Sequence, residues 1–174
     1  MGKKTFIERN IFKIAKILNN KNIDFLICGG IAQSILIEPR ATVDIDIIAK
    51  LKKAEFKKIK EELKKNFKDI FPHKNLMVFK KIKIWRIVIF EEKEQFLLDF
   101  LFLDNKYFSE ILKRKVEIKL EGKILPIVSP EDLYILKSLS NREIDKWDRK
   151  KIKEKFKLSF DMEYVKKWLK ILKG

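Results

Sequence analysis

The sequence predicts an α/β fold that continues into a helical part. Up to about residue 127, short apolar runs with the alternation of strands lie between segments whose apolar residues recur at helical spacing. After that point only helical patterns remain. Five glycines and four prolines leave few breaks, so most of the 174 residues should be regular structure. We therefore predict an α/β core over residues 1–127 and a C-terminal helical portion over 128–174, packed on the core.

The first elements are justified by a helix signal and by two short apolar strands. Thr5 and Glu8 have the spacing of a capping box, and apolar residues follow at helical spacing. The first strand ends at Gly29-Gly30, and the helix after it stops before Pro39. In order, the expected strand, short helix, strand and lysine-rich helix cover Ile23–Cys28, Ile31–Glu38, Thr42–Ala49 and residues 52–67.

The middle of the chain has the pattern of strands and the end has that of helices. Three strands, a helix and a hairpin are expected over Leu76–Lys80, Ile82–Phe90, Gln95–Leu103, residues 106–114, and Val116–Leu120 with Lys123–Ile127. Ser129 is a good N-cap and Pro130 suits the first helical position of the next helix. Two more helices are predicted over residues 143–156 and 161–172.

Composition narrows the class of protein. The 46% hydrophobic content argues against a disordered chain. The net charge of +16 favours anionic partners such as nucleic acid, nucleotides or an anionic membrane surface, although it would also suit a solvated lysine-rich surface. The one cysteine, Cys28, suits a reducing compartment. The first thirteen residues lack a signal-peptide pattern and no apolar run is long enough to span a bilayer, so we expect a cytoplasmic protein without a membrane partner.

Two aspartates stand in one apolar strand, Thr42–Ala49. Side chains two residues apart on a strand point to the same face, so Asp44 and Asp46 should face one way. Two carboxylates beside a core repel each other and are poorly solvated unless a cation lies between them. Mg²⁺ prefers such oxygen ligands. The alternative is a strand with one face in solvent.

The glycine pair Gly29-Gly30 lies between a strand and a helix. Glycine lets the backbone approach a ligand, and a helix N-terminus offers free N–H groups to an anion. Ser34, one turn further on, could add a hydroxyl. The string GGIAQS is neither a P-loop nor a dinucleotide-binding fingerprint, and a tight strand-to-helix turn is the alternative.

Asp99 is surrounded by six large apolar residues in the string FLLDFLF. If its strand lies beside the strand of Asp44 and Asp46, three carboxylates converge, as two-metal phosphoryl or nucleotidyl transfer requires. The alternatives are a buried pair with an arginine and a strand with a short polar face.

The aromatic residues have two interpretations. Trp85, Trp147 and Trp168 are predicted to pack in cores or helix contacts. Trp85 or Phe79, with lysines close by in the sequence, could instead stack on RNA.

The string ICGG, followed after thirteen residues by DID, resembles the signature of the DNA-polymerase-beta-like nucleotidyltransferase superfamily. The longer string GGIAQSILIEPRATVDIDII is similar to the branch that contains AbiEii-type toxin nucleotidyltransferases. In that branch Arg-x-Thr-x-Asp-x-Asp is typical, and it is matched here by Arg40, Thr42, Asp44 and Asp46.

A second motif of the same superfamily is matched nearer the carboxyl end. Members often carry a helix with a lysine, then an arginine, then two aspartates three residues apart. The string VSPEDLYILKSLSNREIDKWD is similar and supplies Lys137, Arg142, Asp145 and Asp148. Ordinary ion pairs on a helix surface would give part of the same pattern.

The resemblance implies a fold and a reaction. The fold would be a nucleotidyltransferase-type mixed sheet of about four to six strands, flanked by helices. The reaction would move a nucleoside monophosphate from an NTP to an acceptor hydroxyl and release pyrophosphate. Asp44 and Asp46 would bind two Mg²⁺ ions, for which Mn²⁺ can substitute. Asp99 would complete one metal site and help to deprotonate the acceptor.

The resemblance also implies how the nucleotide is held. Gly29 and Gly30 would hold the β- and γ-phosphates through backbone N–H groups, with Ser34 near them. Lys137 and Arg142 would neutralise phosphate or position the base. Arg40 would do the same, or would support the strand of Asp44.

The acceptor and the partners stay open. The +16 charge favours RNA, including tRNA, while a protein or a small molecule such as an antibiotic would require the same chemistry. A different class of function, a non-catalytic basic RNA-binding module with a decayed nucleotide site, is the alternative. The toxin resemblance also raises an antitoxin protein as a partner.

Overall fold

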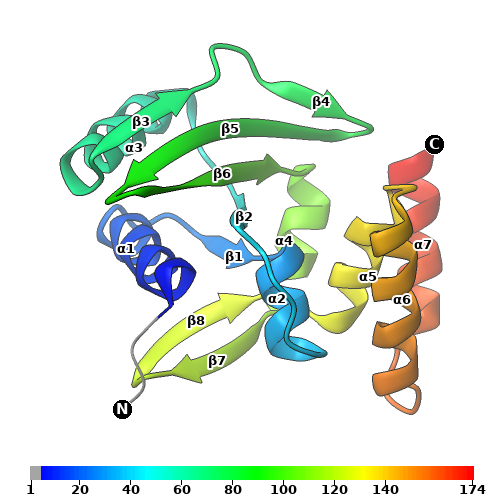
Figure 1. Ribbon diagram of the computed structural model, residues 1–174. Helices are drawn as coiled ribbons and strands as arrows, with labels where there is room; N and C mark the ends of the chain where they lie inside the picture. Colours follow the sequence, from blue (N-terminus) through cyan, green and yellow to red (C-terminus); the bar gives the residue numbers. More distant parts are fainter. Residues whose placement is uncertain (1–4) are drawn as a thin grey trace.

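The computed structural model describes residues 5–174 and shows one mixed sheet with helices on both faces (Figure 1). Seven of the eight strands follow the order β3-β5-β6-β2-β1-β8-β7, and β4 pairs with β5 outside this order. The predicted α/β class with a helical C-terminal portion is therefore confirmed. The expected count of four to six strands is too low. Residues 1–4, which belong to the predicted core and to the stretch compared with signal peptides, lie outside the described residues.

The elements have the following bounds. The strands are β1 (Phe25–Ile27), β2 (Asp44–Ala49), β3 (Asp69–Pro72), β4 (Met77–Phe79), β5 (Ile82–Glu91), β6 (Glu94–Phe102), β7 (Val116–Leu120) and β8 (Lys123–Ile127). The helices are α1 (Phe6–Asn20), α2 (Gly29–Leu36), α3 (Lys53–Asn66), α4 (Asn105–Lys113), α5 (Pro130–Ser138), α6 (Glu143–Lys155) and α7 (Met162–Lys173).

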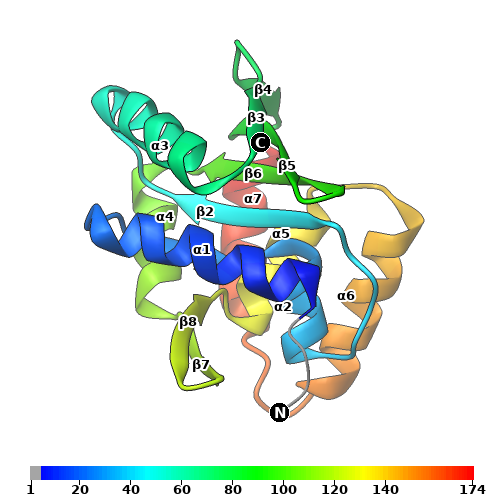
Figure 2. The same ribbon diagram turned by 60° about the vertical axis from the view of Figure 1, so that its left-hand side comes forward.

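One face of the sheet is covered by α1 and α3 (Figures 1 and 2). Thr5 begins α1 with the predicted capping box, because its hydroxyl accepts from the Glu8 N–H and the Glu8 carboxylate accepts from the Thr5 N–H. Phe96 of β6 makes edge contacts with Phe6 and Phe67, at the start of α1 and the end of α3. These aromatic contacts hold the two helices on the apolar side of the sheet.

The opposite face carries α4 and the three C-terminal helices (Figure 1). Ser129 caps α5 as predicted, its hydroxyl accepting from the N–H of Asp132 at 3.1 Å. Tyr107 of α4 packs on Trp168 of α7 with ring centroids 4.5 Å apart. Helix α5 contacts α2, α6 and α7, so it joins the helical portion to the strand-helix unit of the glycine pair. The division at residues 127 and 128 stays a prediction.

The centre of the sheet places β2 between β1 and β6. Strand β2 runs antiparallel to β1 and parallel to β6, with Asp46 opposite Asp99. Strands β5 and β6 form an antiparallel hairpin that places Arg86 opposite Asp99. Asp46, Asp99 and Arg86 therefore form one row across three strands on the same face of the sheet.

Strand β3 is the element that the sequence prediction missed. It has four residues, ends at Pro72 and pairs only with β5, at the edge of the sheet. A proline is tolerated there because an edge strand has free N–H positions on one side. Within residues 5–174, every helix falls short of the length and apolar character required to cross a membrane.

Candidate active site

Gly29 and Gly30 form the first turn of α2 and lie against the side chains of the β2 segment. Gly29 has φ of +63°, and a Cβ at this position would lie 1.9 Å from Oδ2 of Asp46. A Cβ at Gly30 would lie 2.8 Å from the hydroxyl of Thr42. The glycine pair therefore leaves room for the Asp46 carboxylate directly at the helix N-terminus, where backbone N–H groups lack helical partners. The Gly-Gly half and the Asp-x-Asp half of the motif are thus in contact with each other.

Asp44 and Asp46 project from β2 on the side away from α1 and α3, while Ile45 and Ile47 between and after them are fully buried. Burial, together with the charges of Asp99 and Asp44, raises the pKa of Asp46 to about 6, although Lys137 and Arg142 act in the opposite direction. Such repulsion between carboxylates is what a bound divalent cation removes. The oxygen donors of Asp44 and Asp46 therefore fit Mg²⁺.

Asp99 lies beside Asp46 in register, and its carboxylate is bound by Arg86. The Nε of Arg86 donates to Oδ1 at 2.8 Å and Nη2 donates to Oδ2 at 2.6 Å. This contact raises the pKa of the Arg86 guanidinium. Within residues 5–174, no group of three or more His, Cys, Asp or Glu side chains is arranged to hold a metal ion. The strand pairing needed for a three-carboxylate site is present, and the buried Asp99 is at the same time paired with the partly exposed Arg86.

Lys137, at the end of α5, lies between two buried aspartates of α6. Its Nζ is 2.5 Å from Oδ2 of Asp148 and 3.4 Å from Oδ1 of Asp145. Arg142 donates to the other oxygen of Asp145 at 2.7 Å, and Arg40 donates to Asp148 at 2.6 Å. Three basic side chains thus surround two carboxylates, next to the site.

The electrostatics of this network extend to β2. Burial alone would raise the pKa of Asp145, but hydrogen bonding from Arg142 and the charge of Lys137 hold it below its usual value. Lys137 and Arg142 also lower the pKa of Asp46 from the value that burial would give. Both bases are therefore close enough to Asp46 to influence an anion bound there.

Ser34 connects the glycine turn to the segment before β2. Its hydroxyl donates to the carbonyl oxygen of Gly30 at 3.0 Å or of Arg40 at 3.1 Å, and it accepts from the Arg40 N–H at 3.3 Å. The structure thus gathers Asp44, Asp46, Asp99 and the glycines, while Ser34 and Arg40 make contacts behind them.

Arg86 is the residue of this region that the sequence prediction did not single out. A signal for it was present: the hairpin turn between β5 and β6 pairs Glu91 with Glu94, which places Arg86 opposite Asp99. An arginine across from a carboxylate amid apolar residues is the expected partner of a buried acid.

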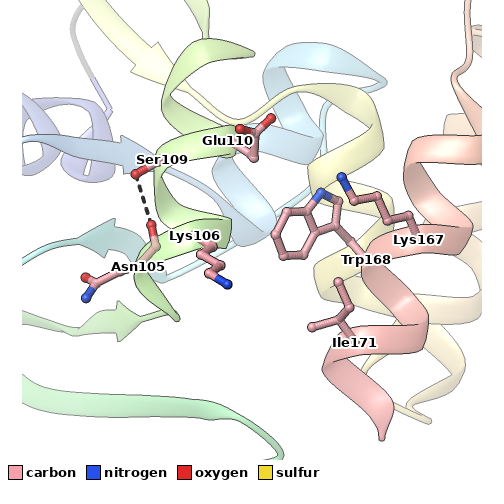
Figure 3. A pocket seen from close by; sticks show the side chains of 7 residues that line it. All are labelled: Asn105, Lys106, Ser109, Glu110, Lys167, Trp168 and Ile171. Atoms are coloured by element: carbon pink, nitrogen blue, oxygen red, sulfur yellow. Dashed lines mark hydrogen bonds between the residues drawn. The ribbon is translucent and has the colours of Figure 1, made fainter.

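Two cavities lie apart from the carboxylates. One of about 570 Å³ lies between α4 and α7 and is lined by Lys106, Glu110 and Trp168 among others (Figure 3). Another of about 500 Å³ lies between α3 and the β3–β5 region and includes His73 and Trp85. None of the residues predicted for the site lines either cavity.

The predicted packing of Trp147 is wrong. Its side chain is 52% exposed on the outer face of α6, with Nζ of Lys151 at 5.0 Å and of Lys150 at 5.7 Å from the ring centroid. Helix α6 turns Asp145 and Asp148 inward towards Lys137, so the tryptophan faces solvent. Trp85 and Trp168 are buried as predicted.

These features agree with a family assignment. The chain belongs to the family described as "Nucleotidyl transferase of unknown function (DUF2204)", whose model matches residues 7–173. The AbiEii-type branch is not distinguished by this match. No curated protein is significantly similar to the chain in sequence.

Solved structures share the fold. An antigenic nucleotidyltransferase-like protein from Paracoccidioides brasiliensis has a TM-score of 0.54 at 18% identity, over 92% of this chain and 86% of that one. The lincosamide antibiotic adenylyltransferase LnuA, in its lincomycin-bound form, has a TM-score of 0.55 at 14% identity, over 84% and 96%. ANT(2'')-Ia, in complex with adenylyl-2''-tobramycin, has a TM-score of 0.57 at 14% identity, over 94% and 95%. The sheet with its flanking helices is thus a nucleotidyltransferase fold.

Proposed function

We propose that this protein transfers a nucleoside monophosphate from an NTP to an acceptor hydroxyl and releases pyrophosphate, in a reaction that depends on Mg²⁺. The observation that carries the proposal is the position of Asp46. Its carboxylate lies against Gly29 and has its pKa raised to about 6 by burial and by the charges of Asp99 and Asp44. Repulsion between carboxylates lowers the stability of the fold, and perturbed acids of this kind cluster at functional sites.

Asp44 and Asp46 would hold Mg²⁺, and Mn²⁺ would substitute because it takes the same oxygen ligands. A bound divalent cation would polarise the reacting phosphate and neutralise charge on the leaving pyrophosphate. A second ion, as the resemblance implies, would require Asp99 to turn towards the cations as well. Asp99 would accept the proton of the attacking hydroxyl.

The phosphates of the NTP would bind at the N-terminus of α2. The N–H groups of Gly29 and Gly30 would meet the β- and γ-phosphates. Lys137 and Arg142, which already act on Asp46, would neutralise phosphate charge. Ser34 would fix the glycine turn through its contact with the Gly30 carbonyl, and Arg40 would hold Asp148 and hence Lys137.

We favour RNA as the acceptor. Helix α6 starts beside the site, next to Arg142, and carries the exposed Trp147 flanked by Lys150 and Lys151. Lysines can bind phosphates of a single strand while an indole stacks on a base. The net charge of +16 acts in the same direction. A toxin of the AbiEii type, held by an antitoxin in a reducing cytoplasm, would fit this activity.

A small-molecule hydroxyl is the second candidate acceptor. The observation in its favour is the shared fold with LnuA and ANT(2'')-Ia, whose structures were solved with lincomycin and with adenylyl-2''-tobramycin.

The reaction is tested by incubating the protein with each α-labelled NTP, Mg²⁺ or Mn²⁺, and total RNA or cell lysate. Label that moves to RNA supports RNA as the acceptor. Label on a small molecule or a protein would show that this molecule is the acceptor instead. Absence of transfer, with salt-sensitive RNA binding that survives Asp44→Ala, would instead support a non-catalytic RNA-binding module.

The RNA surface has a matched control. Replacing Lys150 and Lys151 together with alanine should weaken RNA binding about tenfold at moderate salt, because two phosphate contacts are lost. The same change at Lys57 and Lys58, which are exposed on α3 on the other side of the sheet, removes equal charge and should have a smaller effect. Equal losses for both pairs would remove the support for a surface on α6.

A further inference from the structure

Arg86 is bound to the third carboxylate of the site in a two-point contact. Its guanidinium donates to both oxygens of Asp99, at 2.8 and 2.6 Å. The Asp99 side chain is 7% exposed and that of Arg86 is 33% exposed. Both residues belong to one antiparallel hairpin that is continuous from Lys83 to Phe102, so their register is fixed by the ladder rather than by side-chain choice.

We propose that Arg86 positions Asp99 and takes the place of a second divalent cation, so that the aspartates of this protein hold one ion rather than two. The inference rests on the proposed nucleotidyl transfer and concerns the same site. Asp44 and Asp46 hold the ion, while Asp99 stays with Arg86.

The geometry of the Arg86 contact fixes the orientation of Asp99. A planar guanidinium that contacts both oxygens of a carboxylate forms two parallel, charge-assisted hydrogen bonds. For Asp99 to turn both oxygens towards a cation, the two bonds must break, and Arg86 must be left without its partner. Breaking such a pair is costly because its carboxylate is buried. Asp99 is thus held in one orientation.

The charges on this face of the sheet favour a single divalent ion. The row Asp46, Asp99 and Arg86, with Asp44 next to it on β2, contains three carboxylates and one guanidinium. Before nucleotide binds, one divalent ion makes this group neutral, whereas two would leave it with an excess of two positive charges in a partly buried place. Lys137 and Arg142, which also act on Asp46, add further positive charge beside the group and so disfavour a second cation.

The position of Arg86 leaves the space next to Asp46 open. Arg86 lies on the opposite side of Asp99 from Asp46, because β6 is between β5 and β2. Its guanidinium therefore holds the Asp99 carboxylate from that side without occupying the space next to Asp46. Asp99 keeps lone pairs with which it can accept a proton from an acceptor hydroxyl. A side chain held in place in this way is oriented before substrate binds.

The test counts bound Mn²⁺ by electron paramagnetic resonance. The sample contains the protein and an equimolar non-hydrolysable NTP analogue, and the count is corrected for Mn²⁺ bound by the analogue alone. We expect one Mn²⁺ per chain. Asp99→Asn should weaken Mn²⁺ binding much less than Asp46→Asn, which should weaken it at least tenfold. Arg86→Gln, which frees Asp99, should raise the count towards two, while Arg86→Lys should keep it at one because the charge remains.

Circular dichroism and thermal melting show whether each variant is folded. If Arg86→Gln does not fold, Arg86→Lys still tests the proposal. Two ions in the unmodified protein, with one lost in Asp99→Asn, would overturn the role of Arg86 and leave the proposed transfer intact. No Mn²⁺ binding with any of the four NTP analogues would overturn both.

Discussion

Two groups of aspartates lie near each other in this protein and differ in how their charge is balanced. Asp145 and Asp148 of α6 are buried and receive direct contacts from Lys137, Arg142 and Arg40. The fold itself thus supplies basic partners for both carboxylates. This network ties α6 to α5 and to the segment before β2.

The group on the sheet is different. Asp99 has Arg86, but within residues 5–174 no direct ion pair reaches Asp44 or Asp46, and the pKa of Asp46 is raised to about 6. The comparison teaches that similar residue types serve two purposes. Where every carboxylate has a base, the group stabilises the structure. Where carboxylates beside a helix N-terminus repel each other without a direct ion pair, we infer that the group binds a ligand.

The largest expected effect is on nucleotidyl transfer, and it distinguishes the aspartates of the sheet from those of α6. Asp46→Asn should lower nucleotidyl transfer by roughly a hundredfold to a thousandfold, the range found when one charge-stabilising group is removed from an active site. Turnover of labelled NTP measures it, and folding is checked by circular dichroism. Asp69→Asn, at an exposed position on β3, is the matched control and should keep full turnover. Full turnover in Asp46→Asn would exclude this residue as a metal ligand.

The next effect concerns stability in the paired group. Lys137→Met leaves two buried aspartates with fewer partners and should lower the free energy of unfolding by about 3 kcal/mol. Urea unfolding measures it. Lys146→Met removes only an exposed pair with Glu143 and should cost less than about 0.5 kcal/mol. Comparable losses would show that the buried network is not what holds α6 in place.

The close approach of Gly29 to Asp46 gives a third comparison. Gly29→Ala should cost about 2–4 kcal/mol, because a methyl group would both strain the backbone and displace the carboxylate. Gly122→Ala has a similar φ of +76° with no atom within 4 Å of its Cβ, so it should show the backbone cost alone, about 1–2 kcal/mol. If the two variants unfold at the same urea concentration, the contact with Asp46 has no energetic weight.

The pH dependence gives the smallest effect. The pKa of Asp46 is about 6 in the folded protein against a usual 3.8, so between these values the folded state keeps a proton that the unfolded chain has lost. Stability without metal should therefore fall as pH rises from about 4 to 6, by roughly 1–3 kcal/mol for this group. Other acids also titrate there, so the measurement is the difference between the unmodified protein and Asp46→Asn in EDTA. Identical pH profiles would contradict the shift.

Much of the fold could be predicted because the local signals agree with it. Capping at Thr5 and Ser129, helical spacing and strand alternation place most elements within a few residues. Strand β3 was missed because four residues ending in Pro72 carry little periodicity, and its pairing with β5 is set by the sheet rather than by its own sequence.

The site was predictable in part. Asp44 and Asp46 share a face because they belong to one strand, but the parallel pairing of β2 with β6 joins distant segments and could only be stated as a condition. The Arg86–Asp99 pair could have been predicted, because the short hairpin turn between β5 and β6 sets the register that places the two residues opposite each other. Trp147 was misplaced because α6 buries aspartates against Lys137 and exposes an aromatic side chain, the reverse of the usual pattern.

The proposed cation site depends most on the repulsion that raises the pKa of Asp46, and thermal melting with and without Mg²⁺ at pH 7.5 tests it most directly. Mg²⁺ should raise the melting temperature of the unmodified protein by several degrees, since about 1 kcal/mol corresponds to roughly 2–4 °C for a chain of this size. Asp46→Asn should melt higher than the unmodified protein without Mg²⁺ and respond little when it is added. A lower melting temperature for Asp46→Asn in EDTA, with an undiminished response to Mg²⁺, would contradict the account.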